Sequence, residues 1–262
     1  KLSTPYDYIK DYNFLQANHQ LAEHAIVHPP GAVLLYYYLS KIVIYPELIA
    51  IVLLMVSLLV IFYVRNLFLL EFSKDLSNFM TIVFIFLPAV QVYYLSSIDS
   101  FISLFFVGSI YHFEKWRRSQ DYKHLLYTSL HIILMSFFAY TIFYVLAIIF
   151  AYSYSGLSIV PKYVRKSNYS KEHLHLVWII LLPLFFVLIL QFLLFDYNFV
   201  EGLLQTAKYE NRHFTYNNLL LHSPLTYFIT RIECISEIVL FFGPILSYFC
   251  KTISAHRFSP YV

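Results

Sequence analysis

Long apolar runs separated by polar loops recur along the 262 residues of this chain. A helix needs about 20 apolar residues to cross the hydrocarbon core of a bilayer, and several of these runs approach or exceed that length. The chain is 60% hydrophobic and only 13% charged, which excludes an ordinary soluble domain and a disordered chain. We therefore predict an all-α polytopic transmembrane bundle with about seven spans. The predicted spans are 47–64, 76–94, 98–113, 173–195 and 227–250, together with an apolar block at 124–152.

Two apolar runs leave their topology open. The block at 124–152 permits either one long tilted helix or two short helices in a hairpin. The run at 31–44 reaches only about two-thirds of a bilayer core, and its three consecutive tyrosines, Tyr36 to Tyr38, are typical of an interface. We predict that 31–44 is a juxtamembrane helix lying along the surface. Most other Tyr and Phe side chains are expected to face lipid or the interface.

Basic loop residues discriminate between these topologies, because cytoplasmic loops are enriched in Lys and Arg. If 31–44 does not cross and 124–152 crosses twice, the basic loops fall on one side. A crossing at 31–44 would instead put the basic loop 114–123 beside the acidic N-terminal loop. The favoured topology places twelve basic residues inside: Arg65, Lys74, Lys115, Arg117, Arg118, Lys123, Lys162, Arg165, Lys166, Lys171, Lys251 and Arg257. The opposite face keeps Lys1, Lys10, Lys208 and Arg212.

This topology divides a single membrane domain, 1–262, into three parts. An external loop and juxtamembrane helix occupy 1–46, the transmembrane bundle occupies 47–250, and a second external loop occupies 196–226. Because the polar opening at Lys1 has no apolar run before it, we expect the chain to be part of a longer protein. The net charge of +3 does not suggest a nucleic-acid partner.

Asp99 lies between two apolar runs, in the stretch YLSSIDSFISLFF. A carboxylate beside hydrocarbon is costly and usually faces a cavity or a partner. One interpretation is structural, with Asp99 or Ser97 capping the first turn of the 98–113 helix. The other is functional, with Asp99 acting as a general base or a metal ligand at the external mouth of the bundle. The two interpretations are compatible.

His28 stands at the end of the external loop, directly before Pro29 and Pro30. Proline suits the first position of a helix, so one interpretation of His28 is a polar loop residue beside a rigid helix start. Histidine is also the side chain best suited to bind a metal or share a proton near neutral pH. The loop contains further acidic residues and histidines that favour a site there: Asp7, Asp11, Glu23 and His24.

Donor chemistry makes three side chains on the predicted external face candidate ligands of a divalent metal ion such as Mg²⁺, Mn²⁺ or Zn²⁺. They are Asp99, His28 and Glu23.

Three charged residues, Arg231, Glu233 and Glu237, enter the last apolar run, 227–250. An unpaired charge there is costly, so we expect Arg231 to neutralise one of the glutamates or the phosphate of a lipid-linked ligand. The structural interpretation is an internal ion pair. The functional one makes Arg231 and Glu237, together with His24 of the loop, substrate-binding residues.

The phrase HAIVHPPGAVLL, residues 24–35, resembles a signature of the C-type (GT-C) glycosyltransferases. A prokaryotic branch of that superfamily has an external loop ending in HAxxHPPGxxLL, followed by a short juxtamembrane helix and two spans. Its members then carry an Asp in a Y-x-x-S-x-D context, which YYLSSIDSF matches with Asp99. The stretch YFITRIECISEIVLFFGPI is a looser match to a later tyrosine and arginine followed by FLGxP. The resemblance covers nearly the whole chain.

This resemblance implies an enzyme that takes a sugar from a polyprenyl-phosphate donor on the external or lumenal face. The external loop and Asp99 would frame the active site, with the donor phosphate approached from the membrane. In the superfamily an acidic residue just after the first transmembrane helix serves as base or metal ligand. No such helix precedes Asp7 and Asp11 here, so these residues are its candidate equivalents unless the equivalent lies before Lys1.

The expected reaction is sugar transfer to a glycan, lipid or protein acceptor, with Asp99, Asp7 or Asp11 taking the acceptor proton. The leaving phosphate would be stabilised by a cation, by His28 or by Arg231. The alternatives are a transporter or flippase that uses intramembrane charges, and a non-catalytic scaffold subunit. The sequence shows no internal repeat, and its polar residues gather at one predicted face, which favours the enzyme.

Overall fold

The computed structural model of the chain describes residues 4–86, 98–155, 177–214, 225 and 229, and in this part it contains helices and no strands. The all-α prediction is therefore confirmed. The N-terminal helices are α1 (Pro5–Lys10), α2 (Tyr12–Ala17), α3 (Glu23–Ile26) and α4 (Pro30–Ile42). The helices that follow are α5 (Pro46–Ser57), α6 (Leu59–Leu69), α7 (Lys74–Ile85), α9 (Ile98–Ser119), α10 (Tyr122–Ser136), α11 (Ile142–Ser155), α12 (Val177–Phe195) and α13 (Phe199–Phe214).

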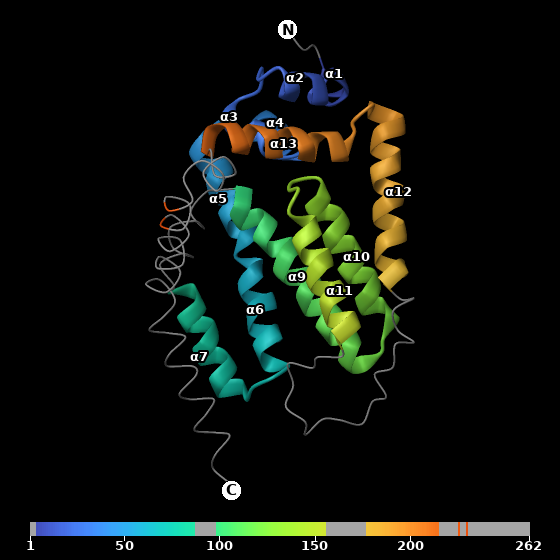
Figure 1. Cartoon of the computed structure of the whole chain (residues 1–262). Coiled ribbons are helices and arrows are strands. Elements are labelled where there is room, and N and C mark those ends of the chain that lie inside the picture. The colour runs from blue at the N-terminus through green and yellow to red at the C-terminus, as the bar shows by residue number, and fades with distance from the viewer. Residues whose placement is uncertain (1–3, 87–97, 156–176, 215–224, 226–228, 230–262) are drawn as a thin grey trace, which may run out of the picture.

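The longer helices stand side by side, and two helices lie across one end of them (Figure 1). The transverse helices are α4 and α13, and α1 and α2 lie beyond them. We call this end, with α1 to α4, α13 and the turn 137–141, the covered end. The opposite end carries the turns 70–73 and 120–121, and we call it the basic end.

Prolines delimit α4 as the sequence predicts. Pro29 is the N-cap residue in extended conformation and Pro30 occupies the first position of the helix, where a missing N–H costs nothing. The helix ends at Ile42, and α5 begins at Pro46. The predicted short helix at 31–44 is thus a separate element, held apart from α5.

The apolar block 124–152 forms two helices, α10 and α11, joined by a turn at 137–141. The hairpin alternative is therefore confirmed over the single long helix. The turn lies at the covered end, so α9, α10 and α11 run alternately up and down the bundle (Figure 1).

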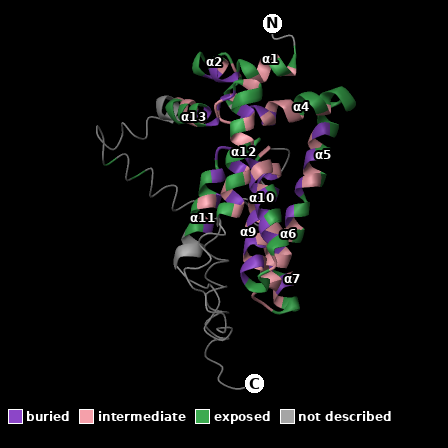
Figure 2. Cartoon of the chain, turned by 90° about the vertical axis from the view of Figure 1, so that its right-hand side faces the viewer, coloured by how far each residue is buried: buried purple, intermediate pink, exposed green. Residues whose placement is uncertain are grey.

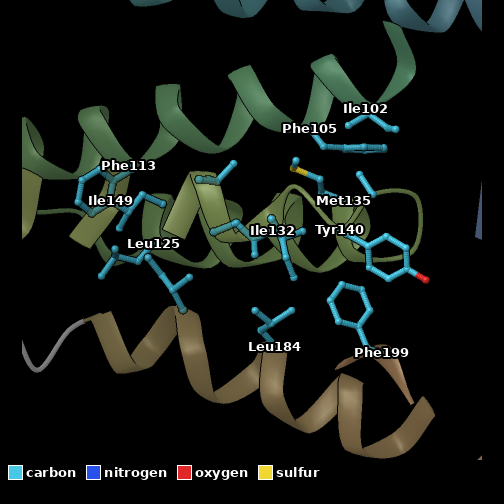
Figure 3. Close-up of a cluster of buried hydrophobic side chains, with 14 of the residues drawn as sticks. Ile102, Phe105, Phe113, Leu125, Ile132, Met135, Tyr140, Ile149, Leu184 and Phe199 are labelled. Carbon is cyan, nitrogen blue, oxygen red and sulfur yellow. The ribbon is translucent and has the colours of Figure 1, made fainter. Parts of the chain in front are cut away.

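A continuous apolar core lies between α9, α10, α11 and α12 (Figure 3). Met135 and Ile132 of α10 face Ile102 and Phe105 of α9 on one side, and Leu184 of α12 lies on the other (Figure 3). The same cluster extends to the covered end. There it includes Tyr12, Tyr140, Tyr197 and Phe199.

The long helices carry many exposed residues (Figure 2), and large apolar side chains are among them. Two helical stretches in the described part are long and apolar enough to cross a membrane, Pro46–Leu69 and Trp178–Phe195. Small polar side chains are buried instead, including Ser57, Ser100, Ser109, Thr128 and Ser136. Large apolar ones are exposed, including Ile51, Met55, Phe62, Leu182, Phe186 and Leu193.

Candidate functional site at the covered end

His28 is held by the turn between α10 and α11. Its Nδ1 atom lies 3.0 Å from the carbonyl oxygen of Phe138. A carbonyl only accepts, so Nδ1 carries a hydrogen, and Nε2 is the nitrogen left for another partner. The half-buried ring therefore presents its Nε2 atom in a defined orientation.

Gly31 lets the start of α4 touch the same turn. A Cβ atom at this position would overlap the carbonyl group of Phe137, which belongs to the backbone and cannot rotate away. Only glycine permits this approach without displacement of a helix. The glycine of the His-Pro-Pro-Gly phrase therefore has a packing reason, because it keeps α4 within reach of the residue that holds His28.

Side chains of α2 bind the loop that leads to His28. The Tyr12 hydroxyl is shared between the carbonyl oxygens of Ala25 and, at 2.6 Å, His28. The Gln16 amide nitrogen lies 2.6 Å from the carbonyl oxygen of Ile26 and 3.0 Å from Oγ1 of Thr206 in α13. The Thr206 hydroxyl also donates to the Ile26 carbonyl oxygen at 2.9 Å, so the loop is joined to a helix 180 residues away in the sequence.

Three tyrosines complete this connection. The hydroxyls of Tyr140 and Tyr197 lie 3.0 Å apart, and the Tyr12 ring packs edge-on against Tyr197 with centroids at 5.8 Å. Burial raises the pKa of Tyr140 to about 12 and also raises the pKa of Tyr12 and of Tyr197. We call Tyr12, Gln16, Tyr140, Tyr197 and Thr206 the buried tyrosine network. The expectation that tyrosines face lipid or the interface is wrong for these three, because the segments at the covered end fold over them.

Asp99 is the second residue of α9 and is exposed. Partial burial, and then the negative charge of Asp99, raises the pKa of Tyr36 in α4. Among the described residues, none donates a hydrogen bond to the Asp99 carboxylate or forms an ion pair with it. Phe101, two residues further along α9, packs edge-on against Phe138, with the two ring centroids 5.2 Å apart. Phe138 thus bonds His28 and also packs against α9 two residues after Asp99.

Asp7 and Asp11 take structural places in α1. Oδ2 of Asp7 accepts from Oγ1 of Thr4 at 2.8 Å, and the Asp7 N–H donates to the same hydroxyl at 3.2 Å, which caps the helix. Asp11 is the exposed C-cap residue of α1. Glu23 is exposed at the start of α3. His24 follows it in the helix, while its side chain, and the whole of Arg231, Glu233 and Glu237, lie outside the described residues.

The predicted metal ligands do not form a binding group in the part of the chain that is described. No three His, Cys, Asp or Glu side chains there are grouped to hold a metal ion, and this includes Asp99, His28 and Glu23. We therefore derive no chemical step through a metal.

A second polar cluster lies inside the bundle toward the basic end and was not identified from the sequence. His112 of α9 and His124 of α10 approach with their Nδ1 atoms 3.2 Å apart. His131, one heptad after His124, hydrogen-bonds the Tyr63 hydroxyl of α6 at 3.1 Å. The available signal was the presence of three histidines in or beside apolar runs, two of them seven residues apart and so near one helix face.

An ion-pair network joins the two turns of the basic end. Arg118 binds Glu71 and the carbonyl oxygen of Leu70, and its Nε donates to Glu114 at 3.2 Å. The buried Arg117 pairs with the other Glu114 oxygen at 2.9 Å. Burial raises the pKa of Glu71, although Arg118 acts in the opposite direction. The turn after α6 is therefore attached to the end of α9.

The chain matches no protein-family model, no curated protein and no solved structure.

Proposed function

We propose that the chain is a membrane-embedded C-type glycosyltransferase that transfers a sugar from a polyprenyl-phosphate donor to an acceptor at the covered end. One observation carries the proposal. Phe138 of the turn 137–141 bonds the imidazole of His28 and packs against Phe101 of α9, two residues after the exposed carboxylate Asp99. A base and a nitrogen that can donate to phosphate are the two groups that such a transfer needs.

The distribution of polarity supports a bilayer around the long helices. Apolar side chains outside and small polar side chains inside are the arrangement expected when the solvent is lipid. On this basis the bundle is polytopic, although only two helical stretches among the described residues are long and apolar enough to cross by themselves. Shorter helices such as α10 and α11 would cross with the help of their neighbours.

The transverse helix α4 has the features of an interfacial helix. Tyr36, Tyr37 and Tyr38 are exposed, and the Lys41 ammonium lies 5.0 Å from the centre of the Tyr37 ring. Aromatic rings and a lysine at its end suit the headgroup layer. We place the covered end on the external or lumenal face, because the opposite end carries Arg65, Lys74, Lys115, Arg117, Arg118 and Lys123. The other predicted inside residues, Lys162, Arg165, Lys166, Lys171, Lys251 and Arg257, lie outside the described residues.

In the proposed reaction an acceptor hydroxyl attacks the anomeric carbon of the donor sugar. The new carbon–oxygen bond forms as the bond to the phosphate breaks, and its electron pair leaves on the phosphate. The Asp99 carboxylate takes the hydroxyl proton. His28, protonated at Nε2, keeps its Nδ1–H bond to Phe138 and offers a second N–H to a phosphate oxygen. Arg231 and Glu237 remain proposed substrate-binding residues.

The test compares two aspartates in equivalent positions at opposite ends. Asp99 and Asp75 are each the exposed second residue of their helix, α9 and α7. Purified chain in bilayer vesicles would be given polyprenyl-phosphate sugars, and release of polyprenyl phosphate would be measured. Asp99→Asn should lower the rate by about 10²-fold or more, the usual contribution of a general base. Asp75→Asn should leave it unchanged.

Equal rates for Asp99→Asn and the wild type would remove Asp99 from the mechanism. If no donor is cleaved but intact donor crosses the vesicle membrane, the chain is a transporter or flippase and the proposal fails. Neither cleavage nor movement of any polyprenyl-phosphate sugar, with the chain folded, would favour the scaffold.

A further inference from the structure

His112 and His124 face each other across the α9–α10 interface, and their Nδ1 atoms are 3.2 Å apart. Their rings are nearly parallel, with centroids at 5.4 Å. A nitrogen pair at this distance forms a hydrogen bond only if one atom carries a hydrogen and the other a lone pair. His124 is buried and His112 half-buried, so the pair has little access to water.

The third histidine of the cluster cannot replace either partner. His131 Nδ1 lies 2.7 Å from the carbonyl oxygen of Tyr127, so this nitrogen carries the hydrogen. Its Nε2 then accepts from the Tyr63 hydroxyl at 3.1 Å. Both nitrogens of His131 are thus engaged, with the ring in its neutral form.

The charged and titratable groups around the pair, in the described part of the chain, add little negative charge. They come from α6, α9, α10 and the turn between α9 and α10. They are Tyr63, Tyr111, Lys115, Asp121, Lys123, Tyr127 and His131. Asp121 is paired with Lys123 at 2.6 Å, and the positive charge of Lys115 acts on both rings.

We propose that His112 and His124 form a proton-binding site that accepts one proton and rejects a second. With no added proton, one ring donates its Nδ1–H to the other. One added proton enters at an Nε2 atom and turns the bond into a stronger charge-assisted one, with the Nδ1–H retained. A second would put a hydrogen on both Nδ1 atoms and two positive charges side by side near Lys115, which breaks the bond.

This site makes the α9–α10 hairpin sensitive to acid at the basic end. The nitrogen–nitrogen bond joins the end of α9 to the start of α10, so its loss loosens this end of the bundle. The inference rests on the geometry of the cluster alone and does not depend on the glycosyltransferase proposal.

The direct test is nuclear magnetic resonance of the full chain in detergent micelles, with ¹⁵N in the histidine rings. His112→Gln and His124→Gln identify the two signals. A ¹⁵N–¹⁵N coupling across the bond should appear at pH 8, and the two rings should bind their first proton together as the pH falls. Two rings that titrate independently near pH 6.5, without coupling, would overturn the proposal.

The second test is the thermal midpoint of unfolding between pH 8 and pH 5. In the unfolded chain both rings take up protons near pH 6.5, whereas the folded pair resists the second, so stability falls as the pH drops. The midpoint of the wild type should fall by about 3–5 °C per pH unit below pH 6.

His112→Gln should abolish most of that slope, because the remaining histidine has no partner to share a proton with. His19→Asn is the control, since His19 is exposed at the covered end, in a left-handed conformation that Asn accepts. If the thermal midpoint of His112→Gln falls with pH as steeply as that of the wild type, the proposal is contradicted. If His112→Gln does not fold, the ¹⁵N–¹⁵N coupling between the two rings of the wild type decides.

Discussion

At the covered end, neutral hydroxyl and amide groups of Tyr12, Gln16 and Thr206 hold the external segments together. At the basic end, the corresponding contacts come from guanidinium and carboxylate groups and from the histidine pair. The first set keeps its protonation state across the physiological range, whereas the second includes groups that titrate within or near it. The contacts at the covered end are therefore expected to be independent of pH across this range, whereas those at the basic end are expected to change with pH.

The largest expected difference concerns two glycines, one at the covered end and one halfway along α9. A Cβ on Gly31 would overlap the backbone of Phe137, while a Cβ on Gly108 would overlap the side-chain ring of His131 and press on the ring of Tyr63. Backbone cannot move without shifting a helix, whereas side-chain rings can shift at the cost of the His131 hydrogen bonds. Gly31→Ala should lower the free energy of unfolding by about 3 kcal/mol, and Gly108→Ala by about 1 kcal/mol. Urea titration of the detergent-solubilised variants measures both.

Equal losses for the two alanine variants would contradict this difference. Gly31→Ala should also reduce donor cleavage more than its stability loss explains, because α4 would move away from the turn that holds His28.

The next effect tests the buried tyrosine network. Tyr12→Phe removes the buried hydroxyl shared by the carbonyls of Ala25 and His28, so both partly buried acceptors lose this bond. The expected loss is about 2 kcal/mol in the free energy of unfolding. Tyr38→Phe, which alters an exposed ring in α4, is the matched control and should change little. A loss below that of the control would show that the network does not hold the loop.

The same network predicts alkaline sensitivity at the covered end. Because burial raises the pKa of Tyr140 to about 12, its contribution to stability is full below about pH 10 and is lost as the pH rises through about 12. Thermal midpoints measured from pH 8 to pH 11 should fall above pH 10, and Tyr140→Phe should make the fall less steep. An unchanged slope would refute the assignment.

The smallest effect is expected for the ion pairs of the basic end. Arg118 and Glu71 are partly exposed, with side-chain exposures of 29% and 22%. Arg118→Gln should therefore cost about 1 kcal/mol or less in the free energy of unfolding, and 0.5 M salt should lessen the difference. Lys123→Gln, which removes the more exposed pair of Lys123 with Asp121, is the control and should leave the free energy of unfolding unchanged. If Arg118→Gln lowers the free energy of unfolding as much as Gly31→Ala does, the ion pairs stabilise the basic end more than this difference between the ends predicts.

Local sequence signals predicted much of the fold. Pro30 and Pro46 delimit α4 as expected, and the length of 124–152 with the loop charges led to the hairpin of α10 and α11. Asp99 and His28 were named as site residues, and they remain candidates: His28 bonds to Phe138, and Phe101, two residues after Asp99, packs against the same residue. These features follow from backbone restrictions and from apolar length, which are properties of short stretches.

Other features of the site could not be read from short stretches. Nothing near Gln16 indicates that its partner is Thr206, and nothing near His112 indicates that its ring meets His124 across a helix interface. Such pairs depend on which helix faces meet.

The sequence by itself determined that this protein is helical, where its first transverse helix starts, and which loops share an end. Those features depend on proline geometry, apolar length and net loop charge, and each of these signals is contained in a short stretch of the sequence. Tertiary structure alone decided which tyrosines are buried, why Gly31 is needed and that two histidines share a hydrogen bond. Burial and close approach are relations between segments distant in the chain, and their energy exists only once the helices have packed.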